Sequence, residues 1–349
     1  MNQCVIGWDI GGAHVKAVML DAQGHIIRVS QQACALWKGL YLLESALNEV
    51  LQQWQLQPAD CSHAVTMTGE LVDLFEHRAQ GVHAIAETVC RHLPDAVFYM
   101  ATPARGAEFT ATASGHESGI ASMNWHASVQ CLAMHHEAAM LVVDIGSTTT
   151  DITLCEKQQV IAAGWTDAAR MQQHGLFYSG VVRTPLMALG PYIEWRQQPR
   201  HIAAEYFATT ADVYRVLGEL PRHYDLADTA DGQDRSINAS MRRLARMVGH
   251  DLQDADTAEW HSLAQAFRQR QISCLLHAIR STLAQHHVQP EAITGLGAGS
   301  FLLPELAQIL NLPYIPASAW MTAAQPQLKD DAEVCFPAYA VARLWQTWH

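Results

Sequence analysis

One pattern, a strand, a glycine-containing turn and a returning strand, occurs twice in this chain and constrains its fold more than any other feature. The runs 5–20 and 141–154 both read as an apolar strand, a turn that begins with aspartate, and a second β-type strand. An internal repeat of this kind indicates two related structural halves. A chain of 349 residues is also too long for one ordinary hydrophobic core. The sequence therefore predicts an α/β protein built from two domains.

The first turn has the composition of an anion site beside a metal ion. Gly11 and Gly12 carry no side chains, so their backbone N–H groups can approach a phosphate closely. Asp9 cannot contact a phosphate directly, because both groups are negative, and we predict that it is a Mg²⁺ ligand instead. Lys16, on the returning strand, is a cation that can neutralise the same anion.

The second turn follows the same logic with hydroxyl groups added. Asp144 ends the strand and is the second predicted metal ligand, and Gly146 opens the turn. The hydroxyls of Ser147, Thr148 and Thr149 can donate to phosphate oxygens. Ordinary hairpin geometry explains either turn taken alone. Their repetition favours a binding site.

A third glycine-rich turn joins the apolar run 292–296 to a helical pattern at 301–310. Gly297, Gly299 and Ser300 lie in this turn. A strand that leads through glycines into a helix N-terminus is suited to binding an anion or a nucleotide. We therefore add these three residues to the predicted phosphate or nucleotide site.

The remaining patterns outline the domains. Apolar residues at helical spacing predict helices at 40–54, 83–93, 118–138 and 337–348. We expect an N-terminal domain at 1–138, with the final helix 337–349 packing back on it, and a C-terminal domain at 139–336. A mainly helical insertion is expected at about 192–286, and its part 222–260 is the most charged region of the chain.

Composition excludes several classes of function. The net charge of -12 supplies no basic field for nucleic acid. No apolar run approaches the roughly 20 residues that cross a bilayer. The eight cysteines are scattered without a C-x-x-C pair, so neither a zinc site nor a dense disulfide framework is suggested. We predict a cytoplasmic protein that binds small molecules, and the sequence leaves a homodimer open.

The three turns together resemble those of a known superfamily. Residues 6–21 resemble the phosphate-1 hairpin of the ASKHA proteins (actin, Hsp70 and sugar kinases). Residues 143–152 resemble the phosphate-2 hairpin in the form typical of the hydantoinase A/oxoprolinase branch, and 295–300 resemble the adenosine-type loop. The resemblance implies an α/β fold in which two ribonuclease-H-like domains face each other across a cleft. It also implies that ATP, ADP or pyrophosphate binds there with Mg²⁺.

Within that branch the chain is similar to a narrower family, encoded beside enzymes of tetrahydromethanopterin-linked one-carbon transfer. The segments that carry this similarity are 67–71, 178–185, 208–214, 229–232 and 242–247. The family implies a transferase of methanofuran or methylofuran biosynthesis. Such an enzyme joins an aminomethylfuran-methyl diphosphate to the phenol oxygen of γ-glutamyltyramine and releases pyrophosphate.

Two further residues receive candidate roles in that reaction. Glu70 follows Thr68-Gly69 and is either the base for the phenol, a metal ligand, or a carboxylate favoured by a helix N-terminus. Arg183 is either a clamp for the diphosphate or the glutamyl carboxylates, or a partner in a surface salt bridge. With Asp9, Lys16 and Asp144 they form the predicted catalytic set.

Two other functions remain open at this stage. One is an ATP-dependent kinase or a hydantoinase/oxoprolinase-type hydrolase, which would consume ATP or water. The other is a nucleotide-binding regulatory protein, because fold alone does not establish catalysis. Turnover without ATP distinguishes the transferase from both.

Overall fold

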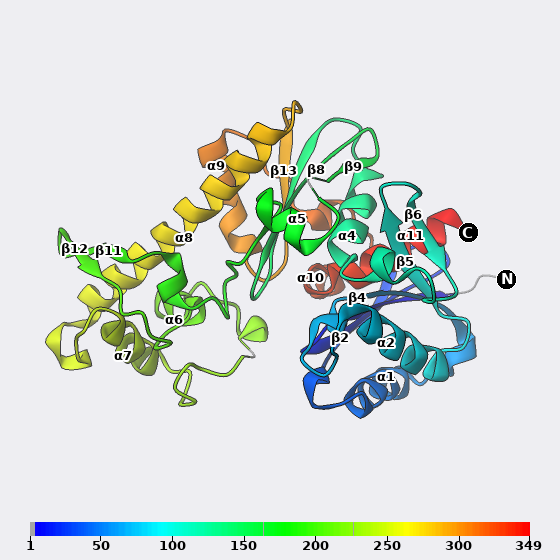
Figure 1. The fold of residues 1–349 in the computed structure, drawn as a ribbon, viewed down its shortest axis with the longest axis horizontal. Coiled ribbons are helices and arrows are strands. Elements are labelled where there is room, and N and C mark those ends of the chain that lie inside the picture. Colours follow the sequence, from blue (N-terminus) through cyan, green and yellow to red (C-terminus); the bar gives the residue numbers. More distant parts are fainter. Residues whose placement is uncertain (1–3, 163, 226) are drawn as a thin grey trace. The chain divides into compact units, whose positions relative to one another are not determined.

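The structure of the protein is a computed structural model, and it describes residues 4–162, 164–225 and 227–349 (Figure 1). The chain divides into two compact units. Unit 1 comprises Met1–Ala138, Cys155–Ile161 and Pro316–His349, and unit 2 comprises Ala139–Leu154 and Ala162–Ile315. Each unit contains one of the two predicted hairpins.

Unit 1 is built on a six-stranded sheet of order β3-β2-β1-β4-β5-β6. β1 and β2 are antiparallel, β2 and β3 are antiparallel, and β4 adds to β1 in parallel. The strands are β1 (Cys4–Ile10), β2 (His14–Leu20), β3 (Ile26–Ala33), β4 (Cys61–Met67), β5 (Val97–Thr102) and β6 (Gly106–Thr110). The short β9 (Gln159–Ile161) also belongs to this unit.

Helices cover both faces of this sheet. They are α1 (Tyr41–Trp54), α2 (Arg78–His92), α3 (Glu117–Ile120), α4 (Asn124–Ala133), α10 (Gln327–Val334) and α11 (Phe336–Trp348). Alternate residues of β1, Ile6 among them, join the apolar side chains of α1 and α2 in one core. Gly7 faces the other way, and a Cβ built on it would lie 1.9 Å from the Ala338 carbonyl oxygen. Glycine at this position therefore lets α11 pack directly against β1.

Unit 2 repeats the central part of this arrangement. Its sheet has the order β10-β8-β7-β13, and β13 adds to β7 in parallel as β4 adds to β1. The elements are β7 (Met140–Ile145), β8 (Thr150–Glu156), α5 (Asp167–Gln172), β10 (Leu176–Phe177), β13 (Ala292–Leu296) and α9 (Leu303–Leu310). The repeat predicted from the two hairpins is confirmed, because in each unit a parallel strand pairs with the first strand of the hairpin.

The segment between β10 and β13 contains a hairpin and three helices. They are β11 (Tyr192–Trp195), β12 (Gln198–His201), α6 (Thr210–Leu217), α7 (Ile237–Met247) and α8 (Thr257–Gln285). α8 is the long yellow helix of Figure 1, and α6, α7 and the hairpin pack against it. The β11–β12 hairpin was not predicted. Its alternation of exposed and buried residues covers four residues, too few to distinguish a strand from a turn of helix.

The long helix predicted at 118–138 is wrong. The structure has α3 and α4 instead, separated by Ala121–Met123. Ala121 pairs with Met67 at the end of β4, and Ser122 takes a left-handed backbone conformation with φ of 54°. The extended pairing and the positive φ are both incompatible with a continuous helix.

Two of the scattered cysteines form a disulfide. Cys4 and Cys61 are directly opposite in the parallel pairing of β1 and β4, and their sulfurs are bonded. Free cysteines buried in the structure are Cys34, Cys131, Cys155 and Cys335, as expected of small core residues. Across the described ranges, no helix has the length and apolar character needed to cross a bilayer.

Candidate active site

The turn between β7 and β8 in unit 2 presents backbone donors to an anion. The Gly146 N–H donates to the Thr149 carbonyl over 2.8 Å and closes the turn. In the described part of the chain, the N–H groups of Ser147, Thr148 and Thr149 have no hydrogen-bond partner. The Ser147 and Thr148 hydroxyls lie 3.4 Å apart on the same turn. Consecutive free N–H groups with adjacent hydroxyls form a concave anion site.

A second segment lies on this turn, and we call residues 179–184 the strap. Within the strap, the Val181 N–H donates to the Gly146 carbonyl over 3.1 Å, and the Arg183 N–H donates to the Ser147 carbonyl over 2.8 Å. A Cβ on Gly180 would lie 2.4 Å from the backbone of Ser147. Glycine is therefore required for this close approach, a reason that the sequence alone does not reveal.

The strap carries Arg183 to the turn. The Arg183 side chain is exposed. Among the described residues it has no ion-pair partner, so the surface salt bridge considered from the sequence is not found there. The Arg183 backbone is bonded to the turn, and an exposed guanidinium at this position is suited to holding a phosphate in a bidentate manner.

The third glycine turn lies beside the end of β7, where the β7–β8 turn begins. The Gly299 N–H donates to the Ile145 carbonyl over 2.7 Å. Gly297 has a φ of 79°, and a Cβ there would lie 2.3 Å from Asp144 Oδ1. Ser300 follows at the start of a short 3-10 helix that leads into α9. The structure thus brings together every residue that the sequence assigned to unit 2.

The first turn, in unit 1, repeats this construction. The Gly11 N–H donates to the His14 carbonyl over 2.9 Å, as Gly146 does to Thr149. The Thr68 N–H donates to the Ile10 carbonyl over 2.9 Å, as Gly299 does to Ile145. In the described ranges no partner is recorded for the N–H groups of Gly12 and Ala13. The two turns are therefore built alike, and each is a candidate anion site.

Asp9 has the most unusual electrostatic setting in unit 1. Its side chain is 6% exposed, and its Oδ1 has no hydrogen-bond partner. Lys16 and Thr66 are its neighbours on the two adjoining strands. Burial raises the pKa of Asp9, and the positive charge of Lys16 offsets part of this rise. A buried carboxylate oxygen without a donor is an expected ligand for a cation.

The residues fit Mg²⁺ better than a metal held entirely by side chains. Among the described residues, no group of three or more His, Cys, Asp and Glu side chains is arranged to hold a metal ion. Mg²⁺ is commonly bound through one or two carboxylates, with water and substrate phosphates as the other ligands. Asp9 in unit 1 and Asp144 in unit 2 are the carboxylates available for this role.

Glu70 lies beside the first turn and is fixed there. Gly69, its neighbour, is so close to the Ile10 and Gly11 carbonyls that a Cβ would lie 3.2 and 3.3 Å from them. Glu70 is 1% exposed, and its Oε1 accepts a hydrogen bond of 2.6 Å from the Ser122 hydroxyl. Glu70 belongs to a 3-10 helix of three residues, Gly69–Leu71. So short a helix has little dipole, which disfavours the reading of Glu70 as a carboxylate stabilised by a helix N-terminus. Ser122 gave no signal in the sequence.

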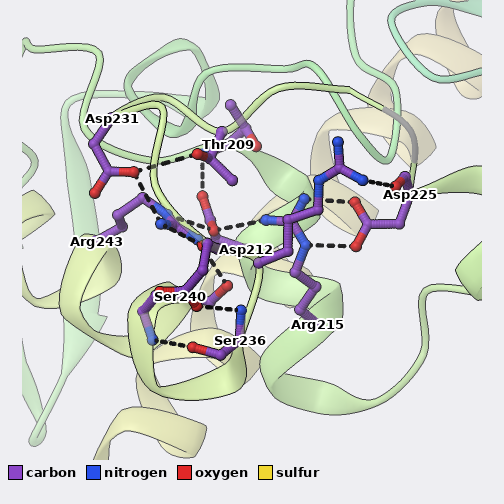
Figure 2. Close-up of polar contacts among 12 residues, drawn as sticks. Thr209, Asp212, Arg215, Asp225, Asp231, Ser236, Ser240 and Arg243 are labelled. Atoms are coloured by element: carbon purple, nitrogen blue, oxygen red, sulfur yellow. Dashed lines mark hydrogen bonds and ion pairs between the residues drawn. The ribbon is translucent and has the colours of Figure 1, made fainter.

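Three of the segments used for the narrower resemblance meet in a buried ion-pair network (Figure 2). Asp212 accepts from the Arg215 and Arg243 side chains over 3.0 and 2.8 Å. Arg215 also pairs with Asp225, and Arg243 pairs with Asp231 over 3.0 Å. Asp212 and Arg243 are fully buried. The network ties Asp225 and Asp231 to α6 and α7, so these motifs have a structural role.

Two ribonuclease-H-like units in one chain, each with a phosphate hairpin and a parallel strand beside it, define an ASKHA-fold protein. A sequence profile of the hydantoinase/oxoprolinase family matches residues 62–324, and the chain belongs to this family. Both the fold class and the family expected from the sequence are confirmed.

Two curated relatives carry the same name, (4-{4-[2-(γ-L-glutamylamino)ethyl]phenoxymethyl}furan-2-yl)methanamine synthase. The one from Methanocaldococcus jannaschii is 26% identical over 347 residues, which cover 99% of this chain and 98% of that protein. The one from Methanococcus vannielii is 30% identical over 157 residues, which cover 45% of this chain and 70% of that protein.

Solved structures show similarity in fold. Acetone carboxylase in its nucleotide-free form has 10% identity and a TM-score of 0.51, covering 85% of this chain and 66% of that one. Component A of (R)-2-hydroxyglutaryl-CoA dehydratase from Acidaminococcus fermentans has 11% identity and a TM-score of 0.49, covering 99% of both chains.

Proposed function

We propose that this protein is a transferase of methanofuran or methylofuran biosynthesis. It would join a (5-aminomethyl-furan-3-yl)methyl diphosphate to γ-glutamyltyramine and release pyrophosphate. The observation that carries the proposal is the anion site of unit 2, where the exposed Arg183 is held beside three free N–H groups. The names of the two curated relatives support the same product, an ether between a phenol and a furylmethyl carbon.

The reaction needs a site that stabilises a departing anion. The bond between the furylmethyl carbon and the diphosphate oxygen breaks, and the ring oxygen stabilises the cation that remains. The phenol oxygen then bonds to that carbon, its proton passes to a base, and pyrophosphate leaves. Backbone donors and the Arg183 guanidinium would stabilise the developing negative charge, as preorganised donors do in other enzymes.

The other predicted residues receive roles in the same scheme. Asp9 is the candidate Mg²⁺ ligand of unit 1 and Asp144 that of unit 2, and such an ion would neutralise part of the charge of a bound diphosphate. Lys16, opposite Asp9 on β2, adds a positive charge in unit 1. Glu70 is the candidate proton acceptor, because an unassisted phenol loses its proton only near pH ~10. The cytoplasmic location and a homodimer remain predictions.

A direct assay tests the function. Purified protein is mixed with the furylmethyl diphosphate, γ-glutamyltyramine and Mg²⁺ without ATP, and the ether product and pyrophosphate are followed by mass spectrometry. We expect Arg183→Met to raise KM for the diphosphate about 10–100-fold, as loss of a charge-assisted hydrogen bond implies. Arg280→Met, which removes an exposed arginine of α8, is the matched control and should leave KM unchanged.

The assay also separates the other functions. Turnover that requires ATP would replace the transferase by a kinase or an ATP-dependent hydrolase. Nucleotide binding without any turnover would indicate a regulatory protein. Equal KM values for Arg183→Met and wild type would remove the unit 2 turn as the diphosphate site.

A further inference from the structure

A glutamine in the middle of α8 holds the strap from the side away from the turn. Gln271 is 1% exposed. Its amide Nε2 donates to the Ser179 hydroxyl over 3.0 Å and to the Gly180 carbonyl over 2.9 Å. Its Oε1 accepts a hydrogen bond of 2.6 Å from the Tyr214 hydroxyl. Both ends of the Gln271 amide are therefore used in one fixed orientation.

The start of α6 holds the strap at neighbouring points. The Thr210 hydroxyl donates to the Gly180 carbonyl over 2.9 Å, and the Thr210 N–H donates to the Thr184 carbonyl over 2.9 Å. The Thr184 hydroxyl accepts from the Gly180 N–H over 2.7 Å. Gly180, at which a Cβ would clash with the turn, is thus restrained by α6 and by Gln271 together.

Stabilisation of the hydrophobic core does not explain why the buried pair Gln271 and Tyr214 is polar. The same helix buries Phe267, Leu275 and other apolar side chains in the core. A buried amide and a buried phenol must give up water before they bond to each other, so an apolar pair of similar volume would stabilise the core about as well. Burial raises the pKa of Tyr214, so its hydroxyl stays protonated and remains a donor.

We propose that Gln271, supported by Tyr214, is a positioning residue for anion binding: it fixes the strap so that Arg183 stands at the turn of unit 2. This inference rests on the proposed function for the nature of the anion, a diphosphate. Gln271 does not touch the anion. Its effect passes through Gly180 to Arg183, where small displacements weaken the contact with a bound phosphate.

Pyrophosphate binding measured by calorimetry tests this without any turnover. We expect Gln271→Met to weaken pyrophosphate binding about tenfold, as the loss of hydrogen bonds that orient a charged contact implies. Tyr214→Phe removes only the hydroxyl that donates to Gln271, so it should weaken pyrophosphate binding less than Gln271→Met does. Thr282→Val is the matched control, because Thr282 is buried on the same helix and donates to the His174 carbonyl over 3.1 Å, outside the strap. It should bind pyrophosphate like wild type.

A double variant distinguishes positioning from general damage. If Gln271 acts through the arginine, Gln271→Met should have little further effect in a protein that already carries Arg183→Met. Equal losses in both backgrounds would overturn the proposal, and so would wild-type affinity in Gln271→Met. If Gln271→Met does not fold, Tyr214→Phe with wild-type affinity overturns the role of the pair.

The proposed reaction can fail separately. Wild-type protein that binds pyrophosphate and shows these variant effects, but forms no ether, would refute the transferase and keep the positioning role. Wild-type protein that does not bind pyrophosphate would overturn the inference itself.

Discussion

Replacing Asp9 by asparagine removes a negative charge from the interior of unit 1 with almost no change in side-chain volume. Asp9 is buried, its Oδ1 has no hydrogen-bond partner, and burial raises its pKa. Because the folded value lies above the unfolded one, ionisation of Asp9 destabilises the fold as the pH rises through the window between the two values. The wild-type protein carries this destabilisation in full only above the folded pKa of Asp9.

The structure gives a magnitude for this effect. A buried polar atom without a partner costs about 1–3 kcal/mol, and a charged one costs more, although Lys16 offsets part of that here. We expect Asp9→Asn to increase the free energy of unfolding by about 2 kcal/mol, or roughly 4–8 °C in Tm for a unit of this size. The same variant should lose the proposed transferase activity by at least about 100-fold.

Calorimetric unfolding at neutral pH, with a chelator and then with Mg²⁺, measures the change. Mg²⁺ should raise the Tm of wild type more than that of Asp9→Asn, which keeps only Asp144 as a candidate ligand. Asp21→Asn is the control in the same unit, and its expected change in Tm has the opposite sign. The reason is that Asp21 Oδ1 accepts hydrogen bonds from two backbone N–H groups. This control should lower Tm or leave it unchanged. An Asp9→Asn protein that melts at or below the wild-type temperature in chelator would refute the reasoning.

Four further measurements follow from individual contacts. Gly180→Ala should abolish pyrophosphate binding by calorimetry, because its Cβ would lie 2.4 Å from the Ser147 backbone, and unchanged affinity would contradict this. Ser122→Gly should be more stable than Ser122→Ala by about 1 kcal/mol in denaturant unfolding, since glycine accepts the φ of 54°. Asp212→Asn should cost about 3–5 kcal/mol in the same assay, because it removes the carboxylate that two buried arginines share and leaves them only Asp225 and Asp231. Burial lowers the pKa of His63 from its usual 6.5, so stability should fall as the pH drops below about 6.5, and His63→Gln should flatten that slope in unfolding measured against pH.

Much of the site was readable in the sequence because its signals are local. Asp9, Gly11 and Gly12 occur within one turn, and so do Asp144 and Gly146, and the strands on either side are short apolar runs. Backbone conformation and strand pattern are decided by neighbouring residues, so they leave a mark on the sequence. The repeat, the ASKHA class and the family were predicted from these turns, and the strand order and family match confirm them.

Contacts between distant residues were decided only by the tertiary structure. Gln271 reaches the strap, Ser122 bonds to Glu70, and α11 packs on β1. The same kind of long-range pairing, Ala121 with Met67, divides the helix predicted at 118–138. A glutamine or a serine has no local pattern that names its partner, because burial and orientation arise only when separate elements pack. The sequence therefore determined which turns could bind an anion, and the packing decided what holds them in place.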